Sequence, residues 1–173
     1  MASGTPIYNC NLAKTEHAAY LLVVNRGAVA GVNYGHSVYE YKNGTWSILL
    51  NNYVEPNATQ TGIVGLDIEA EENGTLYILT SDDAVTSGMY NLRLKKYDPV
   101  TKQWSTVGGN PLPLDFKTST STSVAISIAP DGTPFVAYRD EQDQDYPKVI
   151  YLDNETKQWS DPHKLADIAS SNL

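Results

Sequence analysis

The sequence predicts an all-β fold made of three four-stranded antiparallel repeats, and three observations support this prediction. Trp46, Trp104 and Trp159 recur 58 and 55 residues apart, each at the start of an expected strand. An Asn-Gly or Asp-Gly turn precedes an apolar run in the second and third repeats. Apolar and polar residues alternate over 64–71, with the period of two that a strand requires. Self-similarity at a fixed spacing indicates a repeat architecture.

The expected strands follow one another in the same order in each repeat. Residues 1–16 are rich in turn-forming residues, and the first strong strand is expected at Ala18–Val24, ending at the tight-turn signal Asn25-Arg26-Gly27. In the later repeats, Asn73-Gly74 and Asp131-Gly132 join the first two strands. The expected boundaries of the three repeats are about 17–50, about 63–107 and about 123–161, within a single repeat domain of 1–173.

Repeated four-stranded meanders with a Trp at the head of the last strand are typical of β-propeller blades. Tyr97–Trp104 resembles the segment between the third and fourth strands of kelch-type blades. Ala129–Tyr138 resembles the segment between the first and second strands of bacterial surface and sialidase-like propellers. The glycine doublet of kelch blades is missing from 76–80 and 135–138, and 127–135 does not match the Asp-box of sialidases. The resemblance therefore implies a propeller without the functional motifs of either family.

Composition excludes several classes of function. The formal net charge is −8 and only twelve Lys and Arg are present, so a nucleic-acid backbone is not an expected partner. A single cysteine, Cys10, excludes an intrachain disulfide and any multi-cysteine metal site. No apolar run reaches the length of a membrane span, and the N-terminus of this form does not resemble a signal peptide.

The working face is expected where the long, varied connections between strands gather, because long loops on a rigid scaffold commonly bind ligands. This face is acidic and rich in tyrosine, whereas the three tryptophans are expected to be buried packing anchors between blades. The candidate ligand-binding residues are His36, Tyr53, Asp82, Asp83, Tyr90, Tyr138, Asp140, Asp143, Asp145 and Tyr146.

The chemistry of these loops leaves several interpretations open. Asp140, Asp143 and Asp145 are a weak calcium candidate, because their segment lacks the glycine and distal glutamate of an EF-hand loop. Paired carboxylates are also the groups that glycosidases use as acid and base. Simple solvation of an acidic loop is the plainest alternative. No cofactor and no nucleophile–base pair is expected.

The leading hypothesis is a non-enzymatic binding or assembly module from a bacterial extracellular or surface protein, which presents the loop face to a glycan or a protein. The alternatives are a glycoside-processing enzyme, or part of one, and a purely structural propeller fragment. Closed propellers need about 4–8 blades, and this chain supplies three. A homodimer that completes a six-bladed propeller is therefore expected. A fragment of a longer single-chain propeller is the competing explanation.

Overall fold

The computed structural model describes residues 7–29, 32–54, 63–83, 89–109, 112, 116–117, 124–140 and 146–164. The all-β prediction is confirmed: the described chain forms three antiparallel sheets and contains no helix that could cross a membrane. Blade 1 has the strand order β1 (Ile7–Lys14), β2 (Ala19–Val29), β3 (Val32–Lys42) and β4 (Thr45–Tyr53). Blade 2 has β5 (Ile63–Ala70), β6 (Leu76–Asp83), β7 (Met89–Asp98) and β8 (Gln103–Thr106), with the short β9 (Phe116–Lys117) paired to β7. Blade 3 has β10 (Val124–Ile128), β11 (Pro134–Asp140), β12 (Tyr146–Tyr151) and β13 (His163–Lys164).

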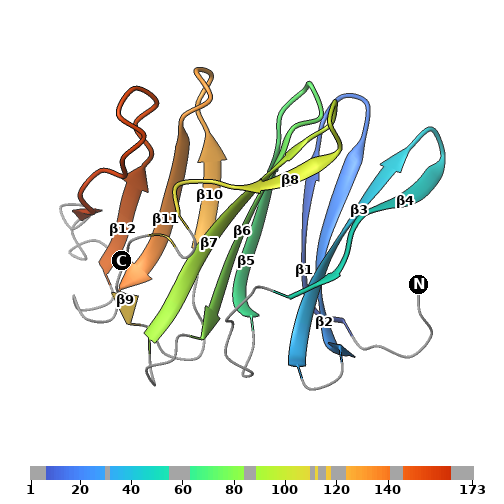
Figure 1. The fold of residues 1–173 in the computed structure, drawn as a ribbon, viewed down its shortest axis with the longest axis horizontal. Coiled ribbons are helices and arrows are strands. Elements are labelled where there is room, and N and C mark those ends of the chain that lie inside the picture. Colours follow the sequence, from blue (N-terminus) through green and yellow to red (C-terminus); the bar gives the residue numbers. More distant parts are fainter. Residues whose placement is uncertain are drawn as a thin grey trace, which may run out of the picture.

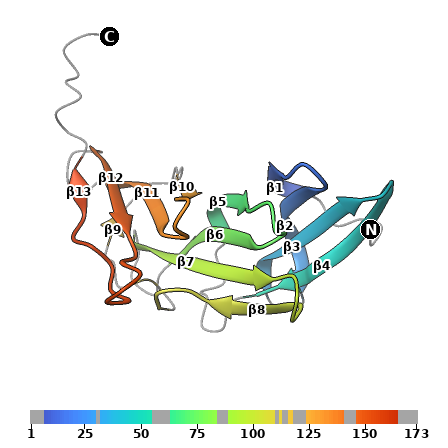
Figure 2. The same ribbon diagram turned by 90° about the horizontal axis from the view of Figure 1, so that it is seen from above.

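The three blades pack side by side in a row, with the face of each sheet against the next (Figure 1). Seen from above, β1, β5 and β10 lie along one edge of the stack, and β4 and β8 lie along the opposite edge (Figure 2). The inner strand β5 contacts both β1 and β10. Each blade is therefore an up-and-down meander that runs outward from the inner edge, as propeller blades do.

Short turns gather at one end of the blades, which we call the turn end (Figure 1). In the predicted turns Asn73-Gly74 and Asp131-Gly132, Oδ1 of the first residue accepts a hydrogen bond from the backbone N–H two residues later, at 2.7 and 2.9 Å. The turns 98–102 and 153–157 share a second pattern, in which the opening aspartate accepts bonds from amides two and three residues on. These amide donors lower the pKa of both opening aspartates. Local hydrogen bonding thus shapes the turn end.

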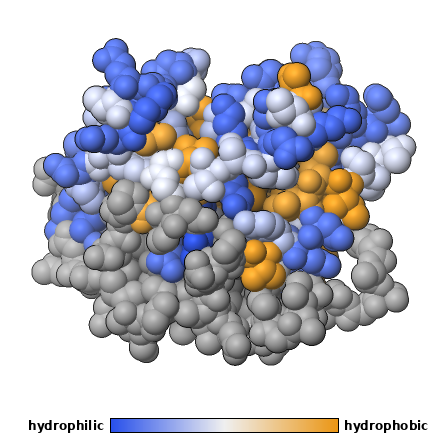
Figure 3. Space-filling model, in the orientation of Figure 1, coloured by the Kyte–Doolittle hydropathy of each residue, from blue (hydrophilic) through white to orange (hydrophobic). Residues whose placement is uncertain are grey.

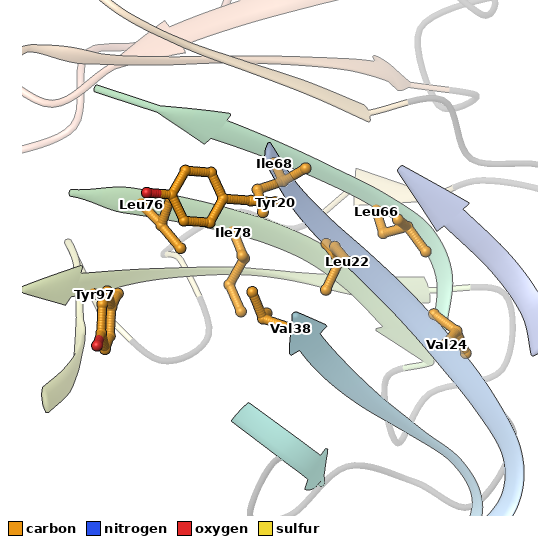
Figure 4. Close-up of a cluster of buried hydrophobic side chains, with 9 residues drawn as sticks. All are labelled: Tyr20, Leu22, Val24, Val38, Leu66, Ile68, Leu76, Ile78 and Tyr97. Atoms are coloured by element: carbon orange, nitrogen blue, oxygen red, sulfur yellow. The ribbon is translucent and has the colours of Figure 1, made fainter. Parts of the chain in front are cut away.

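Two apolar cores fill the spaces between the blades. The core between blades 1 and 2 consists of Tyr20, Leu22, Val24, Val38, Leu66, Ile68, Leu76, Ile78 and Tyr97 (Figure 4). The core between blades 2 and 3 consists of Tyr77, Leu79, Leu92, Leu94, Leu112, Ile126, Val136, Tyr138 and Ile150. Successive residues of a strand point to opposite faces, so β6 supplies Ile78 to the first core and Leu79 to the second. Burial of each large side chain contributes about 1.5–3 kcal/mol to holding the blades together.

Asp67 on β5 links the inner strands of all three blades. Its Oδ1 accepts hydrogen bonds from Nδ2 of Asn11 on β1 at 2.6 Å and from the backbone N–H of Ile68 at 2.9 Å. Its Oδ2 accepts a bond from the backbone N–H of Ile126 on β10 at 2.9 Å. A single carboxylate therefore ties blade 2 to both of its neighbours at the inner edge.

Blade 1 begins earlier than the sequence predicts. The strand β1 pairs with β2 from Ile7–Asn25 to Lys14–Ala19, so the blade spans 7–53 rather than about 17–50. The turn predicted at 25–27 lies inside β2, where a shift of register between Arg26 and Val29 accommodates the irregularity. The signal was misleading because an Asn-x-Gly sequence fits a strand bulge as well as a turn.

The tryptophans occupy equivalent positions in the blades but differ in burial. Trp46 and Trp104 pair with the third strand of their own blade, and Trp159 pairs with Leu152, directly after β12. Half-buried Trp104 donates its indole N–H to the carbonyl of Leu49 at 3.2 Å, and half-buried Trp159 donates to the carbonyl of Gly108 at 2.8 Å. Trp46 is 51% exposed, so the prediction that all three are buried anchors is wrong for this residue. The described residues contain no blade that precedes blade 1 and could cover it.

Candidate functional site

The end of the blades opposite the turn end is the one that the sequence predicts as the working face. Here β2 leads to β3, β6 leads to β7, and β11 leads to β12 (Figure 1). We call it the connection end. Most of the connections themselves lie outside the described residues. The described part of the connection end therefore consists of the strand residues that approach it. Two polar clusters lie there, one in each space between blades.

The first cluster, His36, Tyr53 and Lys95, lies between blades 1 and 2. His36 pairs with Val24 on β2, and its ring packs edge-on against Tyr53 with 5.3 Å between centroids. Lys95 Nζ on β7 donates to the Tyr53 hydroxyl at 3.2 Å and lies 4.5 Å from the centre of its ring. The cluster therefore joins the last strand of blade 1 to the third strand of blade 2.

His36 is completely buried, and neither ring nitrogen has a hydrogen-bond partner among the residues that the structure describes. Burial, followed by the charge of Lys95, lowers the pKa of His36 to about 3. The imidazole is consequently neutral at physiological pH and is shielded from solvent. The sequence places this residue in a loop that could face a ligand, but the structure places it inside β3, against the core.

The second cluster lies between blades 2 and 3. The Asp140 carboxylate forms an ion pair with Lys148, with 2.7 Å between Oδ2 and Nζ, and both side chains are mostly buried. Beside them, burial is the main factor that raises the pKa of Tyr138. Toward the outer edge, Lys164 Nζ lies 3.7 Å from the centre of the Tyr146 ring. The cluster thus combines two tyrosine rings, two lysines and one carboxylate.

Blade 1 has a polar network at the position equivalent to the Asp140–Lys148 pair. Asn25 on β2 donates from Nδ2 to Ser37 Oγ on β3 at 2.9 Å and to Asn52 Oδ1 on β4 at 2.8 Å. Asn25 and Ser37 are both buried. Blades 1 and 3 therefore each have a polar pair between their second and third strands near the connection end. The pair is neutral in blade 1 and charged in blade 3.

The structure places some of the predicted site residues and leaves others outside its described part. Tyr53, Tyr138, Asp140 and Tyr146 lie in the clusters described above. The backbones of Asp82, Asp83 and Tyr90 lie near the connection ends of β6 and β7, but their side chains are outside the described part. Asp143 and Asp145 also fall outside the described residues. Of the weak calcium candidate, only Asp140 is therefore placed, and the Lys148 amine is bound to it. The described residues hold no group of three or more potential metal ligands.

Sequence reasoning missed the lysines of both clusters. Lys95 stands between Leu94 and Lys96 in β7, on the face that packs against blade 1, and is 8% exposed. Lys148 faces blade 2 from β12, opposite Tyr138. A charged residue at an inward position of a strand could have been recognised from the alternation of its neighbours.

Comparison with known proteins identifies the fold. No family model matches the chain, and no curated protein matches it. An α-L-arabinanase of Penicillium chrysogenum, solved with arabinobiose, is similar with a TM-score of 0.64 and 13% identity, over 91% of this chain and 49% of the enzyme. An α-L-arabinofuranosidase of Fusarium graminearum, also with arabinobiose, is similar with a TM-score of 0.64 and 12% identity, over 94% of this chain and 50% of the enzyme. A fucose lectin of Kordia zhangzhouensis, solved with methyl-fucoside, has a TM-score of 0.50 and 12% identity, over 88% of this chain and 96% of the lectin.

At such low identity these similarities establish the fold alone, which is that of a partial β-propeller. The chain spans about half the length of the two enzymes and nearly the whole length of the lectin. The resemblance to kelch-type blades stays a prediction.

Proposed function

We propose that this chain is a non-enzymatic carbohydrate-binding module that presents the connection end of its blades to a glycan. The observation that supports the proposal most directly is the pairing of Tyr146 with the exposed Lys164 in the space between blades 2 and 3. In the other space Lys95 lies against Tyr53 but is only 8% exposed. Tyrosine offers a glycan an apolar ring and a hydroxyl group together, while an ammonium group donates hydrogen bonds to sugar oxygens.

Enzymatic processing of glycosides is the second candidate, because the similar structures include an α-L-arabinanase and an α-L-arabinofuranosidase, both solved with arabinobiose. It requires two carboxyl groups that can act as an acid and a base or nucleophile. The Asp140 carboxylate is bound to the Lys148 amine at 2.7 Å, which favours a structural role for it. We therefore prefer binding to turnover. A purely structural role and a protein ligand are the remaining alternatives.

The module is proposed to act outside the cell or at a bacterial cell surface. We propose no resident cofactor, and calcium binding near Asp140 stays a weaker proposal. We further propose that the loop face belongs to a six-bladed ring made by two copies of the chain. The match to half of each enzyme supports this proposal.

A glycan array followed by titration calorimetry tests the binding proposal, with fucosides and arabino-oligosaccharides included among the probes. Tyr146→Ala should weaken binding at least tenfold, whereas Val100→Ala at the turn end should leave it unchanged. A panel of chromogenic glycosides tests the alternative. Turnover that Asp140→Asn or Asp143→Asn abolishes would overturn the binding-only proposal, and absence of any ligand on both screens would favour the structural role.

A further inference from the structure

On the outer face of blade 1, Leu12 and Tyr41 are exposed, whereas their equivalents in blades 2 and 3 are buried. Residues that pair directly across antiparallel strands lie on the same face of a sheet. By this register the outer face, which we call the blade-1 face, includes the exposed Leu12, Tyr41, Trp46 and Ile48 and the half-buried Leu21 and Tyr39. Leu12 is 59% exposed, Trp46 is 51% exposed and Ile48 is 52% exposed. Apolar surface is visible on the β3 and β4 side of the molecule (Figure 3).

The register identifies the matching positions in the other blades. Leu12 and Leu21 correspond to Ile68 and Ile78 in blade 2 and to Ile126 and Val136 in blade 3. The four equivalents are 0–6% exposed, because each packs against the preceding blade. The blade-1 face therefore has the chemistry of an interface that occurs twice inside this molecule.

Trp46 already has the orientation that its equivalents adopt in these internal interfaces. Its ring lies 5.1 Å from that of Tyr41 at an interplanar angle of 47°. Buried Tyr97 and half-buried Trp104 have the same separation, 5.1 Å, and an angle of 43°. The difference is that the Trp104 indole donates to a carbonyl in the last strand of the preceding blade. The indole of Trp46 is arranged in the same way, but no described residue supplies the equivalent acceptor.

Blade 3 exposes the complementary face, which consists of Phe135, Ala137, Val149 and Tyr151. Phe135 corresponds to Tyr20 in blade 1 and to Tyr77 in blade 2, since each stands one position before the matched residue, which is Leu21, Ile78 or Val136. Both tyrosines are 3% exposed beneath the following blade, whereas Phe135 is 38% exposed. The Tyr151 ring packs against Phe135 on one side and stacks on His163 on the other, at 5.5 and 6.1 Å.

We propose that the blade-1 face of one copy docks on the blade-3 face of a second copy, and that a twofold axis repeats this contact to close a ring of six blades. The acceptors for Trp104 and Trp159 lie three and four residues after the Trp of the preceding blade. The same spacing after Trp159 reaches 162–163. Trp46 therefore donates to a backbone carbonyl of residues 162–163 in the partner copy. This inference rests on the proposed two-copy ring and names the surfaces that form it.

Each junction joins two different faces, which permits a complementation test. Light scattering during gel filtration should show the wild-type chain at twice the mass of one copy. Trp46→Glu and Phe135→Arg should each weaken dimerisation roughly 30-fold or more per junction, as expected for a central aromatic residue of an interface. Val100→Arg is the matched control, because Val100 is 88% exposed in a turn and lies on neither face. Circular dichroism shows whether each variant remains folded.

A mixture of the Trp46→Glu and Phe135→Arg chains decides which faces meet. In the proposed ring one junction then contains both substitutions and the other contains neither, so the mixture should recover dimers that neither variant forms alone. If the wild-type chain stays monomeric at a concentration 100-fold above that of the glycan assay, the proposal is overturned. That result would favour a longer chain that carries further blades. Dimers unaffected by either substitution would also overturn it. A folded wild-type dimer that binds no glycan would instead count against the proposed function alone.

Discussion

The bridge made by Asp67 predicts a large loss of stability from a substitution of nearly identical shape. Asp67→Asn retains an oxygen that can accept from Asn11 and from the Ile68 backbone, but it places an amide N–H group opposite the backbone N–H of Ile126. Hydrogen bonds to a charged group contribute about 1.5–3 kcal/mol each, and an unsatisfied donor adds its own cost. We expect the free energy of unfolding to fall by about 2–3 kcal/mol.

Thermal unfolding followed by circular dichroism measures this effect. For a chain of this size the expected loss corresponds to a fall in Tm of about 5–10 °C, compared at one protein concentration because association stabilises the folded state. Glu69→Gln is the matched control, since it removes the same charge two residues further along β5. Burial, followed by the charge of Asp67, raises the pKa of Glu69, so the ionised form is already disfavoured in the folded state. The control should therefore be neutral or slightly stabilising at pH 7.

Two results would refute the bridging role. One is a Tm of Asp67→Asn within 1 °C of the wild type, and the other is an equal loss in Glu69→Gln. A double-mutant cycle with Asn11→Ala isolates the contact to blade 1, and a coupling of about 1 kcal/mol is expected from residues in direct contact.

Three further predictions concern other elements. Because the folded-state pKa of His36 is about 3, below its ordinary 6.5, its contribution to stability is complete above pH 6.5 and is lost as the pH falls toward 3. Between pH 7 and pH 5 the free energy of unfolding of the wild type should fall by about 2 kcal/mol on account of His36, and His36→Leu should abolish this part of the fall. Urea unfolding at the two pH values measures it. The same pH dependence in both proteins would contradict the burial of His36. Lys102 has a φ of 57°, so Lys102→Gly should stabilise the protein by about 0.5–1 kcal/mol. Lys42→Gly, in a strand with ordinary φ, should destabilise it by a similar amount, and a loss in both variants would argue against strain at residue 102. Trp104→Ala should cost about 3 kcal/mol in thermal unfolding, because the indole packs against the first core and donates to Leu49, and an unchanged Tm would refute the blade alignment.

The local turn chemistry of this protein could be predicted from the sequence because it depends on residues close together in the chain. Asn73, Asp131 and their following glycines form the expected turns through side-chain bonds to amides two residues away. The alternation over 64–71, which includes Leu66 and Ile68, likewise identified the face that enters the first core. The number of blades and the hairpins β5–β6 and β10–β11 followed from these short-range signals.

The strand β1 and the interior of the candidate site depended on tertiary structure. β1 combines exposed Ile7 and Leu12 with polar residues, so its sequence has no strong strand pattern, and pairing with β2 holds it in place. The charged and aromatic residues at the connection end come from different blades, and only the stacking of those blades brings Tyr53 to Lys95. No spacing along the chain encodes that contact.

The tryptophans show most clearly which features the sequence determined and which the tertiary structure decided. Trp46 and Trp104 follow the same strand-and-turn arrangement, and each packs its ring on a tyrosine in the same way. The sequence alone determined this local geometry, because backbone register sets which side chains meet within one blade. Whether the indole is half-buried or exposed was decided by the tertiary structure. Burial depends on a neighbouring sheet, and blade 2 has one on that side, whereas the described chain has none beside the same face of blade 1.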